Sequence, residues 1–390
     1  MSSYMKPANL SQLQDCLAWA VSSETPVSLI GGNSRASLGH TVPASHTLDM
    51  SHFSGIELYQ PEELVLTAGA GTPMSEIYSA LHEQGQYLPF TPFHPDRTLE
   101  ADISGTQAAG TLGGMIATGI AGARRPHTGS VRDYILGVEG VTGRAAPFKA
   151  GGRVVKNVTG YDLPKLMTGS FGTLAALTRI TIKVLPKPTL SRTLMFAGLD
   201  QQAGIDALHQ ASLSNCEPTG LTYLPTDCAA RAGLEDSNVA LIRLEGTEAS
   251  VQDRTEALIR LIGKSCEVLT GETEETLWHQ ITSASVLPAA SQQSLWRITL
   301  PPSEVTDFLN TSSLQHYYIC WGGGLIWALA PDENWRPQPR SGTAMAIRRT
   351  RDEIPFILPP SAGIKALAKR LKESFDPTGI LNPGKLYGDF

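Results

Sequence analysis

The stretch Thr111–Thr173 opens with TLGGMIATGIAGARRPHTGSVRD (residues 111–133) and closes with GGRVVKNVTGYDLPKLMTGSFGT (residues 151–173). Glycine is dense here, between apolar runs that are typical of strands. Glycine permits positive φ and lets a backbone approach a ligand closely, at an entropic cost to folding. Ordinary turns explain one or two of these glycines, but not the whole set beside Ser/Thr pairs and a basic cluster. The stretch therefore predicts a backbone wrapped around a flat or phosphorylated ligand.

Length and composition are typical of a folded protein with about two domains. The chain has 390 residues, of which 41% are hydrophobic and 17% charged, and one domain usually takes roughly 100–200 residues. The net charge of −6 argues against nucleic acid as a partner, so an anionic ligand needs a local basic site. The N-terminal residues lack the apolar core of a secretory signal, and no apolar run reaches the ~18 residues of a spanning helix. We expect a cytoplasmic protein that contacts a membrane only through partners.

The cysteine pattern argues against a disulfide framework or a metal site. Cys16, Cys216, Cys228, Cys266 and Cys320 are odd in number and have no C-x-x-C spacing. An iron–sulfur cluster would need closely spaced thiolates. We predict reduced, structural cysteines and no metal.

Two short strands run into glycine turns in the first half of the chain. Pro26–Ile30 is followed by Gly31-Gly32-Asn33-Ser34, and Leu64–Ala68 is followed by Gly69-Ala70-Gly71-Thr72 and a helix. Backbone N–H groups in such turns form nests for anions, so both turns are candidate phosphate sites. Neither turn matches G-x-G-x-x-G, and we therefore predict no Rossmann dinucleotide unit.

After Pro186-Lys187-Pro188 the pattern changes to strands and helices without such turns. We predict an α+β fold class with an N-terminal domain over residues 1–188 and an α+β cap domain, with a largely antiparallel sheet, over residues 189–358. A C-terminal helix and tail take residues 359–390. A strand is also expected at Gly152–Val155, and a hairpin turn at Trp321–Gly324.

Taken in order, these motifs resemble the FAD-linked oxidase family, whose FAD-binding domain is of the p-cresol-methylhydroxylase/vanillyl-alcohol-oxidase (PCMH/VAO) type. The matching strings within residues 26–186 are PVSLIGGNS, LTAGAGTP, TLGGMIATGIAGARRPHTGSVRDYILG and VVKNVTGYDLPKLMTGSFGTLAALTRITIKVLP, and FDPTGILNPGK follows at residues 375–385. Within the family, the chain is similar to the E-type subunits of bacterial glycolate oxidases. The resemblance implies an FAD domain of two α+β lobes with the cofactor between them, and a tail that returns to this domain.

The resemblance also assigns cofactor-binding residues. The pyrophosphate positions are matched by Gly31, Gly32, Asn33, Ser34, Gly113 and Gly114. Backbone against the isoalloxazine ring is expected from Gly119, Gly122, Gly129, Ser130, Gly169, Ser170, Gly172 and Thr173, and the adenine or ribityl side is expected to meet Ile180 and Ile182. Relatives with covalent flavin often carry histidine where Asn33 stands, so we expect non-covalent FAD.

The catalytic residues stay unknown from the sequence. Relatives that oxidise glycolate or lactate carry histidine pairs in strings such as GDGN-x-H, which would take the hydroxyl proton as hydride leaves. Here the second half has only His209, His279 and His316, well apart. Arg125 and His127 remain as candidates, because arginine suits carboxylate or phosphate recognition. Surface ion pairing is the alternative, and for the later Arg348–Arg351 cluster we expect a solvated or partner-facing patch.

The resemblance implies an FAD-dependent oxidoreductase that oxidises glycolate, or another short 2-hydroxy acid, to glyoxylate or the matching oxo acid. It implies a hetero-oligomer with a related FAD-linked catalytic subunit and an iron–sulfur subunit, which would pass electrons to a quinone-type acceptor at the inner membrane face. The alternative is a catalytically silent FAD-bearing or structural subunit whose paired flavin subunit does the chemistry. A stand-alone oxidase is a third hypothesis.

Overall fold

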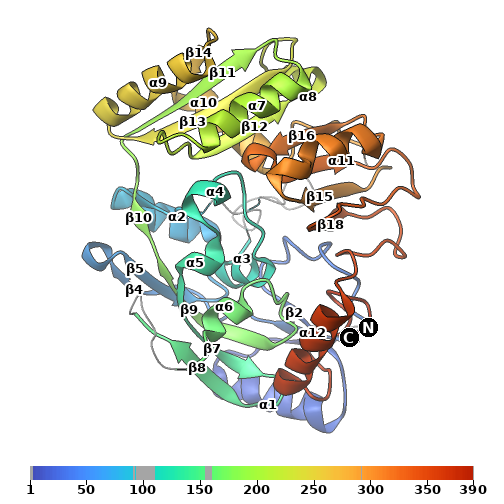
Figure 1. The fold of residues 1–390 in the computed structure, drawn as a ribbon. Coiled ribbons are helices and arrows are strands. Elements are labelled where there is room, and N and C mark those ends of the chain that lie inside the picture. Colours follow the sequence, from blue (N-terminus) through green and yellow to red (C-terminus); the bar gives the residue numbers. More distant parts are fainter. Residues whose placement is uncertain (1–2, 91–92, 94–109, 154–159, 291, 390) are drawn as a thin grey trace.

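The computed structural model describes residues 3–90, 93, 110–153, 160–290 and 292–389 (Figure 1). The described chain forms a small parallel sheet, a five-stranded sheet, a two-stranded ribbon and an eight-stranded sheet. In Figure 1 the eight-stranded sheet and its helices lie above the other sheets. No helix within the described ranges has the length and apolar character needed to span a bilayer.

The first lobe is a three-stranded parallel sheet with one long helix. The strands run in the order β1 (Ser3–Met5), β3 (His46–Asp49) and β2 (Val27–Ile30). Helix α1 (Leu10–Ser22) begins after the N-cap Asn9, whose side chain accepts from Gln12 N. Its buried positions Leu13, Leu17 and Ala20 recur at helical spacing and pack in one core with strand residues of this lobe.

The second lobe is an antiparallel sheet covered by short helices. The strands run in the order β4 (Ile56–Gln60), β5 (Val65–Gly69), β9 (Ala175–Lys183), β7 (Ile135–Thr142) and β8 (Pro147–Gly151). The helices are α2 (Met74–Glu83), α3 (Leu112–Thr118), α4 (Arg125–Thr128), α5 (Val131–Tyr134) and α6 (Leu163–Met167), with a 3-10 turn at Pro61–Glu63. The ribbon pairs β6 (Gln86–Tyr87) with β10 (Leu185–Pro186). The two lobes match the α+β arrangement expected for the N-terminal domain.

The cap is built on the eight-stranded sheet, in which every pairing is antiparallel. The strand order is β14 (Glu267–Leu269), β11 (Leu190–Ala197), β13 (Val239–Gly246), β12 (Gly220–Leu224), β16 (Tyr317–Cys320), β17 (Leu325–Leu329), β15 (Leu295–Thr299) and β18 (Thr343–Arg348). Its helices are α7 (Gln201–Ser212), α8 (Thr226–Arg231), α9 (Glu248–Ile262), α10 (Gly271–Thr282) and α11 (Val305–Ser312), with 3-10 turns at Pro302–Glu304 and Trp321–Gly323. The largely antiparallel cap sheet predicted from the sequence is confirmed.

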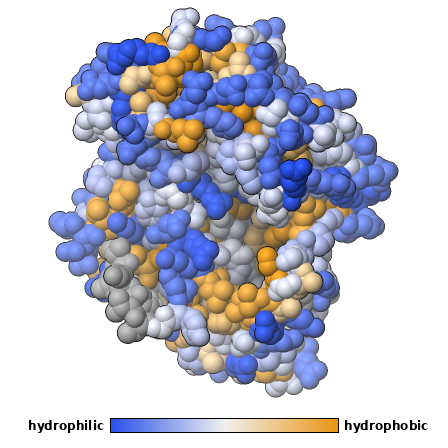
Figure 2. Space-filling view, viewed as in Figure 1, coloured by the Kyte–Doolittle hydropathy of each residue, from blue (hydrophilic) through white to orange (hydrophobic). Residues whose placement is uncertain are grey.

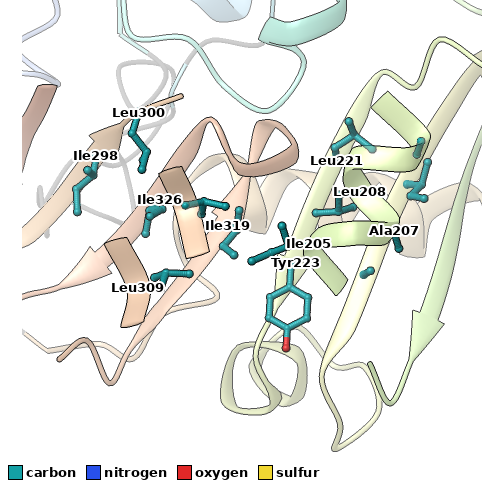
Figure 3. Close-up of a cluster of buried hydrophobic side chains, with 14 of the residues drawn as sticks. Ile205, Ala207, Leu208, Leu221, Tyr223, Ile298, Leu300, Leu309, Ile319 and Ile326 are labelled. Carbon is teal, nitrogen blue, oxygen red and sulfur yellow. The ribbon is translucent and has the colours of Figure 1, made fainter. Parts of the chain in front are cut away.

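One face of the cap sheet carries a core of its own. Figure 3 shows Ile205 and Leu208 of α7 beside Leu221 and Tyr223 of β12. Leu309 of α11 belongs to the same core as Ile319 of β16 and Ile326 of β17. Burying one such side chain contributes about 1.5–3 kcal/mol, so this core is a main source of stability within the cap.

The other face of the cap sheet forms a core that is shared with the N-terminal domain. Phe93 stacks on Trp327 of β17 with ring centroids 5.4 Å apart, and Phe171 meets Phe356 edge-on at 5.2 Å. Arg349, with a side chain only 9% exposed, donates to Gly39 O at 2.8 Å. The solvated patch expected at this arginine is therefore wrong, because its guanidinium binds backbone across the domain contact.

Helix α12 (Ala362–Phe375) and the tail return to the N-terminal domain. Buried Lys372 donates to Thr173 O (2.8 Å), Leu381 O (2.7 Å) and Asp376 Oδ2 (2.6 Å). Leu381 also forms a β-bridge with Val27 of β2.

On the face of the molecule shown in Figure 2, hydrophobic residues gather in separate areas between hydrophilic ones.

Sheet membership supports a division of the chain at residues 188 and 358, which we keep as a proposal. The strand expected at Gly152–Val155 is shifted to β8, Pro147–Gly151, where it pairs with β7, and residues 154–155 lie outside the described residues. The turn Trp321–Gly324 joins β16 to antiparallel β17, which confirms the predicted hairpin.

Candidate functional site: a cavity between the two lobes

A cavity of about 350 Å³ lies between the two lobes of the N-terminal domain. The loop after β2, helix α3, the loop before β9 and the C-terminal tail form its walls. A smaller cavity of about 100 Å³ adjoins it, and Gly31, Gly114 and Asn382 line both. Ligand pockets are commonly about 300–1,000 Å³ in volume, so the space suits part of a large cofactor.

The loop after β2 presents backbone to the larger cavity. Gly31, Gly32, Asn33 and Ser34 follow one another along its wall. Asn33 has a φ of +58°, and the described chain supplies no acceptor for the N–H groups of Gly32, Asn33 and Ser34. N–H groups that converge around a left-handed residue form a nest for an anion. This arrangement is what a phosphate site requires.

Helix α3 packs against this loop through its N-cap residue. Thr111 Oγ1 accepts from Gly114 N at 3.2 Å, and a Cβ on Gly31 would lie 2.6 Å from the same oxygen. Gly113 N donates to Ala70 O at 2.7 Å, and a Cβ on Gly113 would lie 2.8 Å from that oxygen. A Cβ on Gly114 would meet nothing closer than 3.4 Å. Gly113 is needed for packing, whereas Gly114 borders the larger cavity.

The loop before β9 is fixed by the last turn of α3. Gly169 N donates to Ile116 O at 3.0 Å, and Phe171 N donates to Ala117 O at 2.8 Å. Phe171 lines both cavities, whereas Gly169 lines neither. The loop position is thus set by main-chain bonds that the helix supplies.

Three further predicted residues lie in the same loop. Ser170 and Gly172 line the smaller cavity, and Gly172 has a φ of +70°. A Cβ on Gly172 would lie 2.8 Å from Asn382 Nδ2 of the tail. Thr173 does not line the cavity, since its hydroxyl donates to Ser170 O at 2.7 Å.

Four predicted positions lie away from both cavities. Gly119 ends α3 with a φ of +61°, and Gly122 O accepts from Trp321 Nε1 at 2.9 Å. Gly129 and Ser130 precede α5, where Ser130 forms the capping box of that helix. Each has a local structural role, and contact with the isoalloxazine ring stays a proposal for them.

The assignment of Ile180 and Ile182 is corrected by the structure. Both residues are 0% exposed and belong to the core of the second lobe, with Leu66 and Ala68 of the neighbouring strand. A residue must have accessible surface if it is to contact a ligand. Ile180 and Ile182 are two residues apart, so they share one face of β9, and this face belongs to the same buried core as residues of α2 and α3. These positions therefore face the core and not the cofactor.

The second glycine turn is also not a phosphate nest. The N–H groups of Gly69, Ala70, Gly71 and Thr72 all have acceptors, which are Gly55 O, Thr178 O, Phe53 O and Gly69 O. A Cβ on Gly71 would lie 2.6 Å from Met50 O. Glycine is needed here for close backbone packing between strand connections.

Two cavity residues of the tail were missed from the sequence. Asn382 accepts from Leu29 N at 2.8 Å and donates to Phe171 O at 2.8 Å, so it joins β2 to the loop before β9. Lys385 lines the larger cavity and donates to Ala36 O at 2.9 Å. The signal for both was the NPGK string at residues 382–385, which the sequence reasoning used only as a family match.

The basic cluster after α3 serves the contact between domains. Arg124 forms a buried ion pair with Glu245 of β13. The Arg125 guanidinium lies 5.0 Å from the Trp321 ring centroid, beside a surface hollow at the domain junction. Burial lowers the pKa of His127 below its usual range. Neither Arg125 nor His127 lines the cavity between the lobes, so the structure does not bring these catalytic candidates to it.

Histidines in the second half of the chain do not converge. His209 lies on α7 and His279 on α10, while His316 bonds Asp227 at 2.9 Å. Over the residues that the structure describes, no group of three or more His, Cys, Asp or Glu side chains could hold a metal ion.

The fold defines the class of protein. It matches p-cresol methylhydroxylase in a substrate-bound structure with a TM-score of 0.68 at 15% identity, covering 99% of this chain and 88% of that one. It matches alkyldihydroxyacetonephosphate synthase with a TM-score of 0.67 at 17% identity, covering 97% and 75%. The chain has the fold of the PCMH/VAO-type flavoproteins.

Sequence comparison gives the family. Residues 1–151 match the FAD binding domain and residues 362–386 match the FAD linked oxidases, C-terminal domain. The chain is 36% identical over 372 residues to glycolate oxidase subunit GlcE of Escherichia coli (strain K12), covering 95% of each protein. It is 27% identical over 439 residues to glycolate oxidase subunit GlcD of Bacillus subtilis (strain 168), covering 98% and 88%. The chain belongs to the FAD-linked oxidase family with a PCMH-type FAD-binding domain, and FAD is its cofactor.

The cavity between the lobes fits this cofactor. Its wall carries main-chain N–H groups at Gly32–Ser34 without acceptors in the described chain, as a diphosphate needs. Gly114 leaves space on the α3 side, where a side chain would reduce the room for a ligand. FAD would supply the redox chemistry, and these residues would hold it.

Proposed function

We propose that this chain is the FAD-bearing subunit of a complex that oxidises a short 2-hydroxy acid, with glycolate as the substrate. The observation that carries the proposal is the cavity between the lobes, in a chain that is similar over nearly its whole length to GlcE and to GlcD. Those two relatives are subunits of glycolate oxidases by name, which supports a partner with a related flavin domain.

In this reaction the substrate carbon gives up hydride and its hydroxyl gives up a proton, so that an oxo acid forms. Bound FAD would supply the two-electron redox chemistry for this reaction. An iron–sulfur partner would then carry the electrons to a quinone-type acceptor at the membrane. The described part of this chain holds no cluster of thiolates for such a relay. The relay is therefore assigned to the partner.

A second candidate function is a silent flavin subunit, whose partner oxidises the substrate. It is favoured by the apolar character of the cap face that meets the N-terminal domain, where Trp327 and Leu295 pack with Phe93. Burial raises the pKa of Cys320 on this face to about 12, and it raises the pKa of Tyr318 well above its usual value. Neither group is a base at neutral pH.

One experiment separates the two candidates. The chain is purified alone, loaded with FAD and mixed with glycolate without oxygen, while the flavin absorbance band is followed. Bleaching in the isolated chain supports direct oxidation. A flavin that stays oxidised until the partner subunits are added supports the silent subunit. If glycolate never reduces the flavin, even in the assembled complex, the proposed substrate is wrong.

A further inference from the structure

The C-terminal tail places an ammonium group in the wall of the cofactor cavity. Lys385 Nζ donates to Ala36 O, and Lys385 O accepts from His40 N, both at 2.9 Å. The residue is thus tied to the loop after β2 at its backbone and at its side chain. An ammonium group has three donors, so the bond to Ala36 leaves others for a ligand.

Close packing fixes the course of this lysine side chain. Gly39 has a φ of +82°, and a Cβ there would lie 2.6 Å from Lys385 O and 3.0 Å from Lys385 Cε. The aliphatic part of the lysine side chain therefore packs directly on the backbone of Gly39. A side chain at position 39 would occupy the space of this lysine. A flexible side chain is held in one direction by this contact.

The lining of the larger cavity is positively charged. Its ionisable side chains are Arg35 and Lys385, and no carboxylate is present among the described lining residues. Arg349 and His40 lie around Lys385, and the acidic neighbour Asp352 lies 3.9 Å from Arg349. Burial and then Arg349 lower the pKa of Lys385 to about 8. An anion that enters this cavity would therefore meet two cationic side chains and the backbone N–H groups of Gly32–Ser34 in one wall.

We propose that Lys385, together with Arg35, binds the diphosphate of FAD, so that the C-terminal tail is part of the cofactor site. The proposal rests on FAD as the cofactor under the proposed function. The N–H groups of Gly32–Ser34 lie in the same wall, so backbone donors and two cations face one doubly charged group. FAD retention then depends on a residue far along the chain from the glycine-rich loops.

The test uses the full-length chain freed of FAD, and compares the variants Lys385→Met, Lys385→Arg and Lys369→Met. The Met variant keeps the length of the stem and removes the charge, and the Arg variant restores a cation. Lys369 on α12 is exposed and outside the cavity, so its variant controls for net charge. FAD binding is followed by quenching of FAD fluorescence at several salt concentrations, and ADP and adenosine are measured as competitors.

Lys385→Met should weaken FAD binding about 10- to 100-fold, the effect of losing one charge-assisted bond. It should make FAD affinity less dependent on salt, and it should weaken the binding of ADP far more than the binding of adenosine. Lys385→Arg should recover most of the FAD affinity, and Lys369→Met should bind FAD as the wild type does. Equal weakening of ADP and adenosine would show a structural role and overturn the proposal, as would unchanged FAD binding. Wild-type chain that binds no FAD would instead refute the cofactor assignment itself.

Discussion

Replacing Gly114 by aspartate should remove FAD while the fold survives, and replacing its neighbour Gly113 by alanine should do the reverse. The two glycines are adjacent in α3, yet a Cβ at position 114 would meet nothing closer than 3.4 Å, whereas a Cβ at position 113 would lie 2.8 Å from Ala70 O. From the sequence, both glycines are expected at the pyrophosphate of the cofactor. Only their neighbours in the folded chain show that Gly114 borders the cavity and that Gly113 packs against backbone.

At position 114 the expected loss of cofactor follows from charge and volume. A Cβ there would be 3.9 Å from Arg35 Nη1, so an aspartate can pair with this arginine and cancel one of the two cations of the cavity. Losing a charge-assisted contact and adding a carboxylate beside a diphosphate should together cost about 3 kcal/mol or more, which is about a 100-fold rise in the dissociation constant. Gly114→Ala should stabilise the apoprotein by about 0.5–1 kcal/mol through helix propensity.

At position 113 the expected loss is in folding. Overpacking against a backbone carbonyl costs about 1–3 kcal/mol, and the displaced Ala70 O would also weaken its bond with Gly113 N, worth about 0.5–1.5 kcal/mol. Alanine returns about 1 kcal/mol of helix propensity. The net change in the free energy of unfolding should be a loss of about 1–3 kcal/mol.

Urea unfolding of the FAD-free chain measures the free energy of unfolding, and titration with FAD measures the dissociation constant for the cofactor. Gly113→Ala should lower the unfolding midpoint, and Gly114→Asp should leave it near that of the wild type but bind FAD at least 100-fold more weakly. Retained stoichiometric FAD in Gly114→Asp, or an unchanged midpoint in Gly113→Ala, would refute the placement of these residues.

Three further changes test charges elsewhere in the molecule. Glu245→Met leaves Arg124 buried without its partner and should cost about 3–5 kcal/mol in urea unfolding, whereas the double Arg124→Met/Glu245→Met variant should recover most of this loss. Arg297 is buried, and burial lowers its pKa to about 10; its Nη2 donates to Ala121 O at 3.2 Å, but its Nε has no partner among the described residues. Arg297→Met should therefore unfold within about 1 kcal/mol of wild type or be more stable, and a loss above about 3 kcal/mol would contradict this expectation. FAD affinity should be level below pH 8 and fall above it, because Lys385 has a pKa of about 8 and loses its charge as the pH rises; an affinity that stays level to pH 10 would count against a charged Lys385 at the site.

Much of the local structure could be predicted from the chain alone. The loop Gly31–Ser34 and the positions of α3 and β9 follow from short-range patterns of apolar residues, caps and glycine, and the structure shows these elements. Strand period alone does not say which face of β9 meets a ligand, which is why Ile180 and Ile182 were misplaced into the cofactor site. The packing of helices α2 and α3 against this face of the sheet buries them.

Glycine composition was informative, but it did not distinguish two uses of glycine. The turn Gly69–Thr72 looks like a phosphate site by pattern. However, the N–H groups of Gly69, Ala70 and Gly71 donate to carbonyls of other segments, and the N–H group of Thr72 donates to Gly69 O within the turn. The loop Gly31–Ser34 also combines two glycines with a hydroxyl residue, but it keeps N–H groups without acceptors in the described chain. The difference lies in which segments pack beside each turn, and that is a property of the tertiary structure.

By itself the sequence determined the fold class, the family and the cofactor, because these depend on ordered motifs and local periodicity along the chain. The tertiary structure alone decided that Gly114 and not Gly113 faces the larger cavity, that Asn382 and Lys385 of the tail complete its wall, and that Arg349 is buried at the domain contact. Each of these depends on contact between segments that are distant in sequence. Such contacts are set by the packing of whole sheets and domains. A local string such as NPGK at residues 382–385 can mark a segment, but it does not say which cavity that segment lines.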